Sequence, residues 1–122
     1  MATHYRDLHV WRKALDWAET VYKLTAGWPR EERFGLVSQV RRSAISVASN
    51  IAEGAARRTT GEFVQFVGIA QGSLAEAETQ LLLAQRLGYA TDRDASALLA
   101  ASAEISRMLA GLASSLRRRK AA

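Results

Sequence analysis

Hydrophobic residues recur with helical spacing along most of the chain, and the widest apolar surface falls between Leu36 and Gly54. At about 100° per residue, the apolar positions of this stretch cover about half of a helix, more than one neighbouring helix can bury. The pattern predicts a central helix over residues 32–53 that ends at Gly54. The opposite side of this helix carries mainly small or uncharged residues, among them Gln39, Ser43, Ser46 and Asn50.

A first helix is predicted over residues 8–25, where apolar residues recur at intervals of three and four. Two adjoining apolar lines widen its apolar face to about half of the circumference, so one partner helix leaves part of this face uncovered. Gly27 and Pro29 then indicate a turn, because glycine commonly follows a helix end and proline cannot continue a helix.

A third helix is predicted over residues 60–87. It opens with a capping box, in which the side chains of Thr59 and Glu62 satisfy backbone amides that have no partner within the helix. Gly88 marks its end, since glycine adopts the left-handed conformation that commonly terminates helices.

The fourth helix is predicted over residues 92–116, after a weaker cap made by Thr91 and Asp94. Its apolar face is narrow and its back is rich in alanine, which favours an outermost position in the fold. The basic residues 117–122 have no apolar partner and are predicted to form a frayed tail.

These patterns predict an all-α protein, a single domain over residues 1–122 that folds as an antiparallel up-and-down four-helix bundle. No segment alternates with period two, and no internal repeat is present. The chain has no cysteine, no apolar run near the ~20 residues of a membrane span, and no secretory layout at its start. We therefore expect a cytoplasmic protein that does not insert into a membrane.

Polar residues fall within or beside the predicted core at several positions. Gln71, Glu78 and Gln85 repeat every seven residues along the third helix, and Arg41 projects inside the apolar arc of the second. The repeat is either a solvated flank or a line that fixes the register between helices. Arg41 either extends along a helix interface to reach water or pairs with a buried acid; because an unpaired buried charge is costly, we expect a partly buried pair between Arg41 and Glu78. The predicted polar network comprises Arg41, Asn50, Glu53 and Glu78.

The wide apolar faces of the first two helices predict a homo-oligomer. A monomer seldom leaves apolar patches of that size exposed to water, whereas a second copy of the chain can cover them. The residues expected at the contact between subunits are Trp11, Leu15, Tyr22, Ile45, Ala48 and Ala52.

The residue patterns of known catalytic and cofactor sites do not occur in the sequence. His4 and His9 are the only histidines and lie at the start of the chain, and the Glu-x-x-His pairs of a di-iron bundle are missing. Nucleophilic catalysis has no candidate either, since the chain lacks cysteine and no histidine is expected near its serines. We expect no catalytic residues, no metal site and no cofactor, and hence no enzyme.

Several sequence blocks occur in an order that is typical of a known family. The blocks include Val10-Trp11, Gly35-Leu36, Ser49-Asn50-Ile51-Ala52-Glu53-Gly54, Glu62-Phe63 and Gly72-Ser73-Leu74-Ala75-Glu76. Over about residues 5–112, the chain resembles the small bacterial four helix bundle proteins first encountered as products of intervening sequences in 23S ribosomal RNA genes. The resemblance implies an antiparallel four-helix bundle that assembles as a ring, a homopentamer in known relatives. A more distant similarity, to the accessory protein of diversity-generating retroelements, implies a basic surface that binds a reverse transcriptase and nucleic acid.

Arginine dominates the basic residues of the chain. Seventeen Lys and Arg against twelve Asp and Glu give a formal net charge of +5, and fourteen of the seventeen are arginine. The planar guanidinium group suits phosphate, although GC-rich coding can produce the same bias. We interpret the chain as a non-catalytic oligomer that binds RNA, DNA or a nucleic-acid-processing protein through repeated arginines. The candidates are Arg42, Arg57, Arg58, Arg117, Arg118 and Arg119.

The alternative is a protein-interaction scaffold that binds no nucleic acid. In this interpretation Trp28 and Phe34 dock a partner chain, and the arginines keep the oligomer in solution. No aromatic residue alternates with the candidate arginines in the sequence, so base-specific recognition is not predicted.

Overall fold

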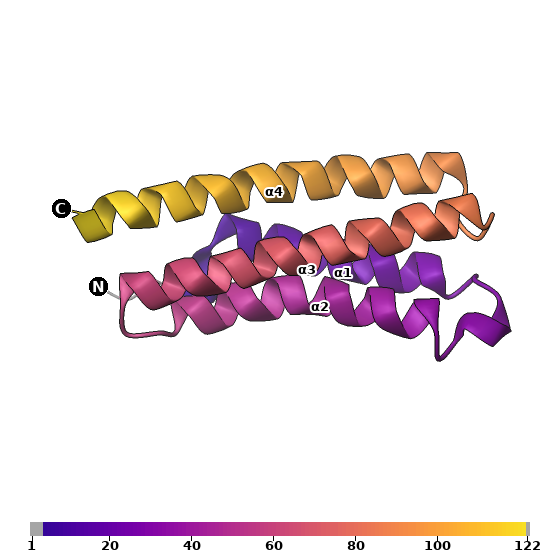
Figure 1. Ribbon diagram of the computed structural model, residues 1–122, viewed down its shortest axis with the longest axis horizontal. Coiled ribbons are helices and arrows are strands. Elements are labelled where there is room, and N and C mark those ends of the chain that lie inside the picture. Colours follow the sequence, from indigo (N-terminus) through magenta and orange to yellow (C-terminus); the bar gives the residue numbers. More distant parts are fainter. Residues whose placement is uncertain (1–3, 122) are drawn as a thin grey trace.

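The computed structural model describes residues 4–121, which fold as four long helices joined by short turns (Figure 1). Consecutive helices run antiparallel, and α4 also packs against α1. No strand occurs among the described residues, so the all-α prediction is confirmed. The helices are α1 (His9–Thr25), α2 (Leu36–Ala55), α3 (Thr60–Arg86) and α4 (Asp92–Ala121), with the short 3-10 helices η1 (Tyr5–Asp7) and η2 (Arg30–Glu32) before α1 and α2.

Most of the wide apolar face of α2 is buried between its two neighbours, with Ile45 at its edge 44% exposed, and α2 packs most extensively against α3. Val40, Val47 and Ile51 on this face have no solvent-accessible surface. The apolar stripes seen in the sequence thus meet in one continuous core. The core extends through Val21 of α1, through Val67, Ala70, Leu74 and Leu81 of α3, and through Ile105 and Leu109 of α4.

Hydrogen bonds confirm Thr59 and Thr91 as the N-caps of α3 and α4, whereas the Glu62 carboxylate accepts from the Thr59 hydroxyl instead of from a backbone amide, so the second half of the predicted capping box is wrong. Thr59 Oγ1 accepts from the backbone N–H of Glu62 at 3.1 Å, and the same hydroxyl donates to Glu62 Oε1 at 2.9 Å. Thr91 Oγ1 likewise accepts from the backbone N–H of Asp94 at 3.1 Å. Gly88 follows α3 with a φ of +80°, which glycine adopts without the strain that a side chain would cause.

Both predicted ends of the central helix are wrong. Residues 30–32 form η2, and α2 begins only at Leu36, whose backbone N–H donates to Glu32 Oε1 at 3.2 Å. At the other end, Gly54 lies inside α2 and is buried against α3. A Cβ on Gly54 would lie 2.7 Å from Phe66 Cβ and 2.9 Å from Phe63 Cδ1. Glycine is required here for close packing of two helices, and it does not terminate α2.

The prediction of a frayed tail from residue 117 is also wrong, because α4 continues through Ala121. Arginine, lysine and alanine are good helix formers, and basic side chains in a last turn interact favourably with the negative end of the helix dipole. Arg118 Nη1 also donates to Ser114 Oγ at 2.8 Å, one turn earlier. Residue 122 of the predicted tail lies outside the described residues.

Within residues 4–121, α4 is the one helix long and apolar enough to cross a membrane by length and composition alone. This finding is weak evidence for membrane insertion, because the core helix of a soluble bundle passes the same test. Leu98, Ile105 and Leu109 of α4 are buried in the core, whereas Glu104 and Arg107 are exposed.

Candidate functional site

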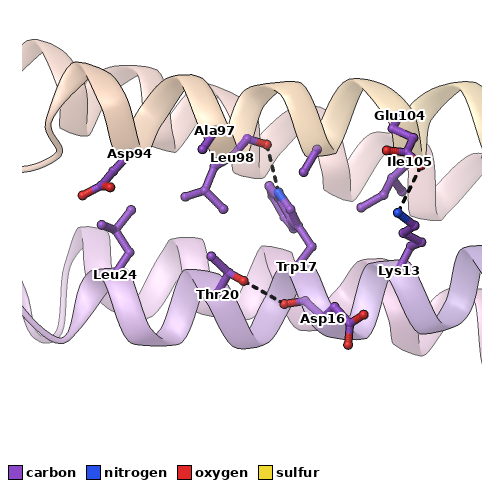
Figure 2. Close-up of a pocket in the computed structure, with 11 residues that line it drawn as sticks. Lys13, Asp16, Trp17, Thr20, Leu24, Asp94, Ala97, Leu98, Glu104 and Ile105 are labelled. Carbon is purple, nitrogen blue, oxygen red and sulfur yellow. Dashed lines mark hydrogen bonds and ion pairs between the residues drawn. The ribbon is translucent and has the colours of Figure 1, made fainter.

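A cleft of about 380 Å³ lies between α1 and α4 (Figure 2). Trp17, Leu24, Leu98 and Ile105 form much of its apolar lining. The indole N–H of Trp17 crosses the cleft and donates to the backbone oxygen of Leu98 at 3.0 Å. Small side chains on α4, Ala97 and Ala101, leave the remaining space open.

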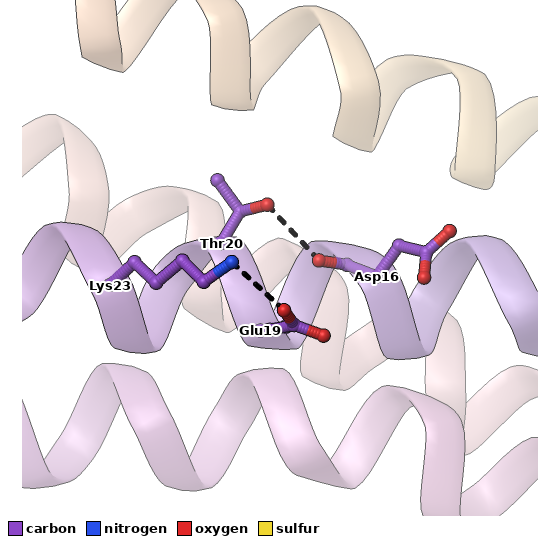
Figure 3. A network of polar contacts seen from close by, with 4 residues as sticks. All are labelled: Asp16, Glu19, Thr20 and Lys23. Atoms are coloured by element: carbon purple, nitrogen blue, oxygen red, sulfur yellow. Dashed lines mark hydrogen bonds and ion pairs between the residues drawn. The ribbon is translucent and has the colours of Figure 1, made fainter.

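Several polar groups at the rim of this cleft are already paired with other groups of the protein. Lys13 Nζ pairs with Glu104 Oε1 at 3.2 Å between α1 and α4. Thr20 Oγ1 donates to the backbone oxygen of Asp16 at 3.1 Å, and Lys23 pairs with Glu19 at 2.9 Å on the neighbouring surface of α1 (Figure 3). Nowhere in residues 4–121 are three His, Cys, Asp or Glu side chains placed to hold a metal ion.

The predicted pair between Arg41 and Glu78 is wrong. Arg41 Nε donates to Thr25 Oγ1 at 2.8 Å, and Arg41 Nη2 donates to the backbone oxygen of Tyr22 at 3.1 Å. Glu78 instead accepts from Ser102 Oγ at 2.6 Å. Arg41 therefore joins α2 to α1, whereas Glu78 joins α3 to α4, so the two side chains serve different helix pairs.

Asn50, the next residue of the predicted polar network, belongs to a set of hydrogen bonds between α2 and α3. Its partners differ from those predicted from the sequence. Asn50 Nδ2 donates to the backbone oxygen and to Oγ of Ser46, at 2.8 and 2.9 Å. Ser46 Oγ lies 2.9 Å from Ser73 Oγ, and Ser43 Oγ donates to Glu76 Oε1 at 3.0 Å. The small polar residues opposite the core face of α2 were the available signal. Glu53 is exposed and takes no part in these bonds.

Part of the heptad line on α3 also faces α4. Ser102 is completely buried, and its single hydroxyl hydrogen is within reach of two acceptors, Glu78 Oε2 at 2.6 Å and the backbone oxygen of Leu99 at 3.0 Å. Gln85 Nε2 donates to Asp92 Oδ1 at 2.9 Å, at the start of α4. Both positions thus contact α4, Glu78 through a partly buried hydrogen bond and Gln85 through a solvent-exposed one. Ser102 itself was missed because it lies within an alanine-rich stretch that the pattern assigned to the back of α4.

Five of the six residues expected at the contact between subunits line one groove on the outer side of α1 and α2. The groove has a volume of about 570 Å³. Leu15 and Ile45 are large apolar side chains with 47% and 44% of their surface exposed. Tyr22 lies outside this groove, with the guanidinium of Arg41 4.4 Å from its ring centroid. The groove residues are Tyr5, Trp11, Leu15, Ala18, Ile45, Ala48, Ser49, Ala52 and Glu53.

Most of the candidate arginines gather at one end of the bundle. The turn between α2 and α3 and the last turn of α4 lie at the same end (Figure 1). A Cβ on Gly61 of α3 would lie 3.0 Å from Lys120 Nζ of α4, which shows how close the two segments are. We call the exposed basic side chains of these segments the basic end; they are Arg57, Arg58, Arg117, Arg118, Arg119 and Lys120.

Two of the candidate arginines have neighbours that the sequence did not reveal. The guanidinium carbon of Arg57 lies 4.7 Å from the Phe66 ring centroid, so the arginine rests on an aromatic ring. Arg42 is exposed but lies apart from the basic end, in the first half of α2 beside Phe34.

The two residues predicted to dock a partner, Trp28 and Phe34, differ in exposure and in neighbours. Trp28 is 7% exposed, and its ring centroid lies 6.1 Å from that of Tyr89. Its proposed role in docking a partner is therefore wrong, whereas Phe34 is 87% exposed. Tyr89 donates its hydroxyl to Glu32 Oε2 at 2.9 Å. This hydrogen bond to a carboxylate, together with burial and the negative charges of Glu32 and Glu31, raises the pKa of Tyr89.

Known proteins match most of the chain in sequence and in fold. A family model described as 23S rRNA-intervening sequence protein matches residues 6–111. The chain is also similar to a crystal structure from Bacteroides thetaiotaomicron VPI-5482, described as a protein with unknown function from the S23 ribosomal protein family. That match has a TM-score of 0.77 and 26% sequence identity, and it covers 85% of this chain and 97% of the other. None of the curated proteins matches the chain.

Proposed function

The chain belongs to the 23S rRNA-intervening sequence protein family, and we propose that it is a non-catalytic helical bundle that self-associates and binds nucleic acid. The observation that supports binding is the basic end, where six basic side chains from two segments far apart in the sequence gather. Guanidinium groups form strong hydrogen bonds with phosphate oxygens. The acidic residue in the first turn of α3, Glu62, already accepts from the Thr59 hydroxyl.

Self-association is proposed through the groove on the outer side of α1 and α2. Its exposed Leu15 and Ile45 flank the small residues Ala48 and Ala52, which allow a second helix to approach closely. A ring of five subunits is the assembly that the family resemblance implies. Such a ring would repeat the basic end five times, so weak phosphate contacts would add up to useful avidity.

The proposed partner is RNA or DNA, alone or within a nucleoprotein complex. The distant similarity to the accessory protein of diversity-generating retroelements supports binding to a nucleoprotein complex. Phosphate contacts alone carry no sequence information, so the basic end supplies affinity without base specificity.

Fluorescence anisotropy with labelled single-stranded RNA and DNA tests the proposal. At about 50 mM salt we expect binding that weakens steeply by about 200 mM, because the bound arginines release counterions from the phosphates. Changing Arg57 and Arg58 together to Glu should weaken binding at least ~10-fold. The matched control changes Arg93 and Arg107, two exposed arginines on α4 away from the basic end, to Glu. No binding at low salt, or equal losses in both double variants, would reject this function.

A substitution in the groove tests the assembly separately. Leu15→Arg places a charge on the apolar groove without disturbing the core, because Leu15 is half exposed. Light scattering should then report a smaller particle while circular dichroism reports unchanged helicity. A wild-type mass of about 13 kDa, the 13.4 kDa of one chain, at micromolar concentration would contradict self-association.

A further inference from the structure

Phe34 is the most exposed large apolar side chain in the described chain. It is 87% exposed, whereas the other exposed large apolar residues lie between 40% and 50%. The backbone that carries it is ordered by its neighbours, since the Gly35 N–H donates to the Glu32 carbonyl at 3.0 Å and the Leu36 N–H donates to Glu32 Oε1. The ring therefore stands in solvent on a fixed turn before α2.

Three arginines share the surface around the Phe34 ring. The guanidinium carbon of Arg33 lies 5.3 Å from the Phe34 ring centroid. Arg41 and Arg42 line the same surface hollow as Phe34, together with the exposed Tyr22, and the hollow has a volume of about 420 Å³. No acidic side chain lines it. We call Tyr22, Arg33, Phe34, Arg41 and Arg42 the Phe34 surface.

Hydrogen bonds hold one arginine of the Phe34 surface, Arg41, in a defined position. Arg41 is held by its hydrogen bonds to Thr25 and Tyr22, and its guanidinium lies over the Tyr22 ring. A second hollow, of about 490 Å³, adjoins the first at Phe34, Ser38 and Arg42. It is lined by polar side chains that include Gln39, Gln80 and Glu76, and the Glu76 carboxylate accepts from the Ser43 hydroxyl. The exposed Phe34 ring is thus bordered by arginines on one side and, on the other, by amides, hydroxyls and one carboxylate that is hydrogen-bonded to Ser43.

These features match the chemistry by which proteins bind single strands. Unpaired bases stack on aromatic side chains, while arginines neutralise the flanking phosphates, and stacking of this kind is not open to bases that are paired within a duplex. We propose that the Phe34 surface is a second nucleic-acid contact that stacks an unpaired base, so that the ligand class of this protein is single-stranded nucleic acid. This inference rests on the proposed function and specifies its ligand.

The Phe34 surface is distinct from the basic end. The two lie at opposite ends of α2, whose 20 residues span about 30 Å at 1.5 Å per residue. A single strand stacked at about 3.4 Å per nucleotide would need about nine nucleotides to cover that length. The two surfaces can therefore be tested with separate variants and separate signals.

The experiment uses a single-stranded oligonucleotide of about 12 nucleotides that carries the fluorescent base 2-aminopurine, and a duplex of the same sequence. Phe34→Ala should weaken binding of the single strand by about 5- to 150-fold, the range measured for loss of one stacking ring. It should also remove the change in 2-aminopurine fluorescence, whereas Phe34→Trp should preserve both binding and signal. Binding of the duplex should not respond to Phe34→Ala. The matched control is Leu87→Ala, which truncates a half-exposed apolar side chain just after α3 and should leave binding of the single strand unchanged.

The outcomes separate this inference from the proposed function. If the single strand binds and responds to Arg57 and Arg58 but not to Phe34→Ala, the basic end stands and the Phe34 surface is overturned. If Phe34→Ala instead reduces the particle mass in light scattering, Phe34 lies between subunits and the inference is also overturned. If wild-type protein binds neither strand form, both proposals fail. The binding measurement is made with an RNA and with a DNA oligonucleotide of the same sequence, which shows whether the Phe34 surface accepts ribose, deoxyribose or both.

Discussion

The packing of α2 against α3 and the packing of α1 against α4 show how one bundle combines a close contact with an open one. Between α2 and α3, Gly54 allows an aromatic ring to approach the backbone, and Ser46 and Ser73 bond directly at 2.9 Å. Between α1 and α4 a cleft of about 380 Å³ remains, and the Trp17 indole reaches across it to Leu98. Small residues occur in both contacts, so residue size alone does not decide how closely two helices pack.

The difference depends on what faces the small residues. Gly54 faces Phe63 and Phe66, which fill the space that its missing side chain leaves. Ala97 and Ala101 line the α1–α4 cleft, and the side chains opposite them on α1 do not fill the space that they leave. The α2–α3 contact is therefore the closer of the two, and the proposed nucleic-acid contacts lie near opposite ends of α2.

The largest expected effect comes from adding one methyl group to the close contact. Gly54→Ala should lower the free energy of unfolding by about 1–3 kcal/mol, because the new Cβ would overlap two phenylalanine side chains. Gly68→Ala is the matched control on the same helix pair. Nothing lies within 4 Å of a Cβ at Gly68, so the substitution should stabilise α3 by up to ~1 kcal/mol. Urea denaturation at one protein concentration measures both, and equal signs would contradict the close contact.

The next effect should come from filling the open contact. Ala101→Leu adds apolar atoms inside the α1–α4 cleft beside Trp17 and should raise the free energy of unfolding by about 0.5–2 kcal/mol. Ala100→Leu, on the exposed side of α4, is its control and should have little effect. Destabilisation by Ala101→Leu would show that the cleft cannot accept a larger side chain.

The smallest effect concerns the hydrogen bond from the Tyr89 hydroxyl to Glu32, which joins the connection before α2 to the turn after α3. Its contribution to stability should depend on pH, since folding raises the pKa of Tyr89 above its unfolded value of 10.0. The contribution is present below pH 10 and is lost as the pH rises through the folded pKa, when an ionised Tyr89 would face the Glu32 carboxylate. The difference in urea midpoint between wild type and Tyr89→Phe should therefore shrink between about pH 8 and pH 11. A difference that stays constant over this range would exclude the coupling.

The sequence predicted the fold well where regular spacing carried the information. The four helices, the caps at Thr59 and Thr91, the end of α3 at Gly88 and the family are confirmed. The error at Gly54 arose because a glycine that ends a helix and one that permits close packing look alike in a sequence. Periodicity gives the direction of Arg41 on its own helix but not its partner on another, which is why the pair with Glu78 was wrong.

The candidate surfaces were predicted only in part for the same reason. The arginines near residues 57 and 117 were identified from composition, whereas their meeting at one end depends on the antiparallel order of the helices. The exposure of Phe34 and the burial of Trp28 were not predictable, because both residues lie in the irregular connection before α2, where no period applies.

The central claim, that the basic end contacts phosphates, is tested most directly by the salt dependence of binding. The logarithm of the association constant for a single strand is measured against the logarithm of the salt concentration for three proteins. These are wild type, Arg57→Gln with Arg58→Gln, and Arg93→Gln with Arg107→Gln. The slope should become shallower by about 0.7 for each phosphate that the first double variant no longer neutralises, and it should stay near the wild-type value in the second. Equal slopes in the two double variants would contradict phosphate binding at the basic end.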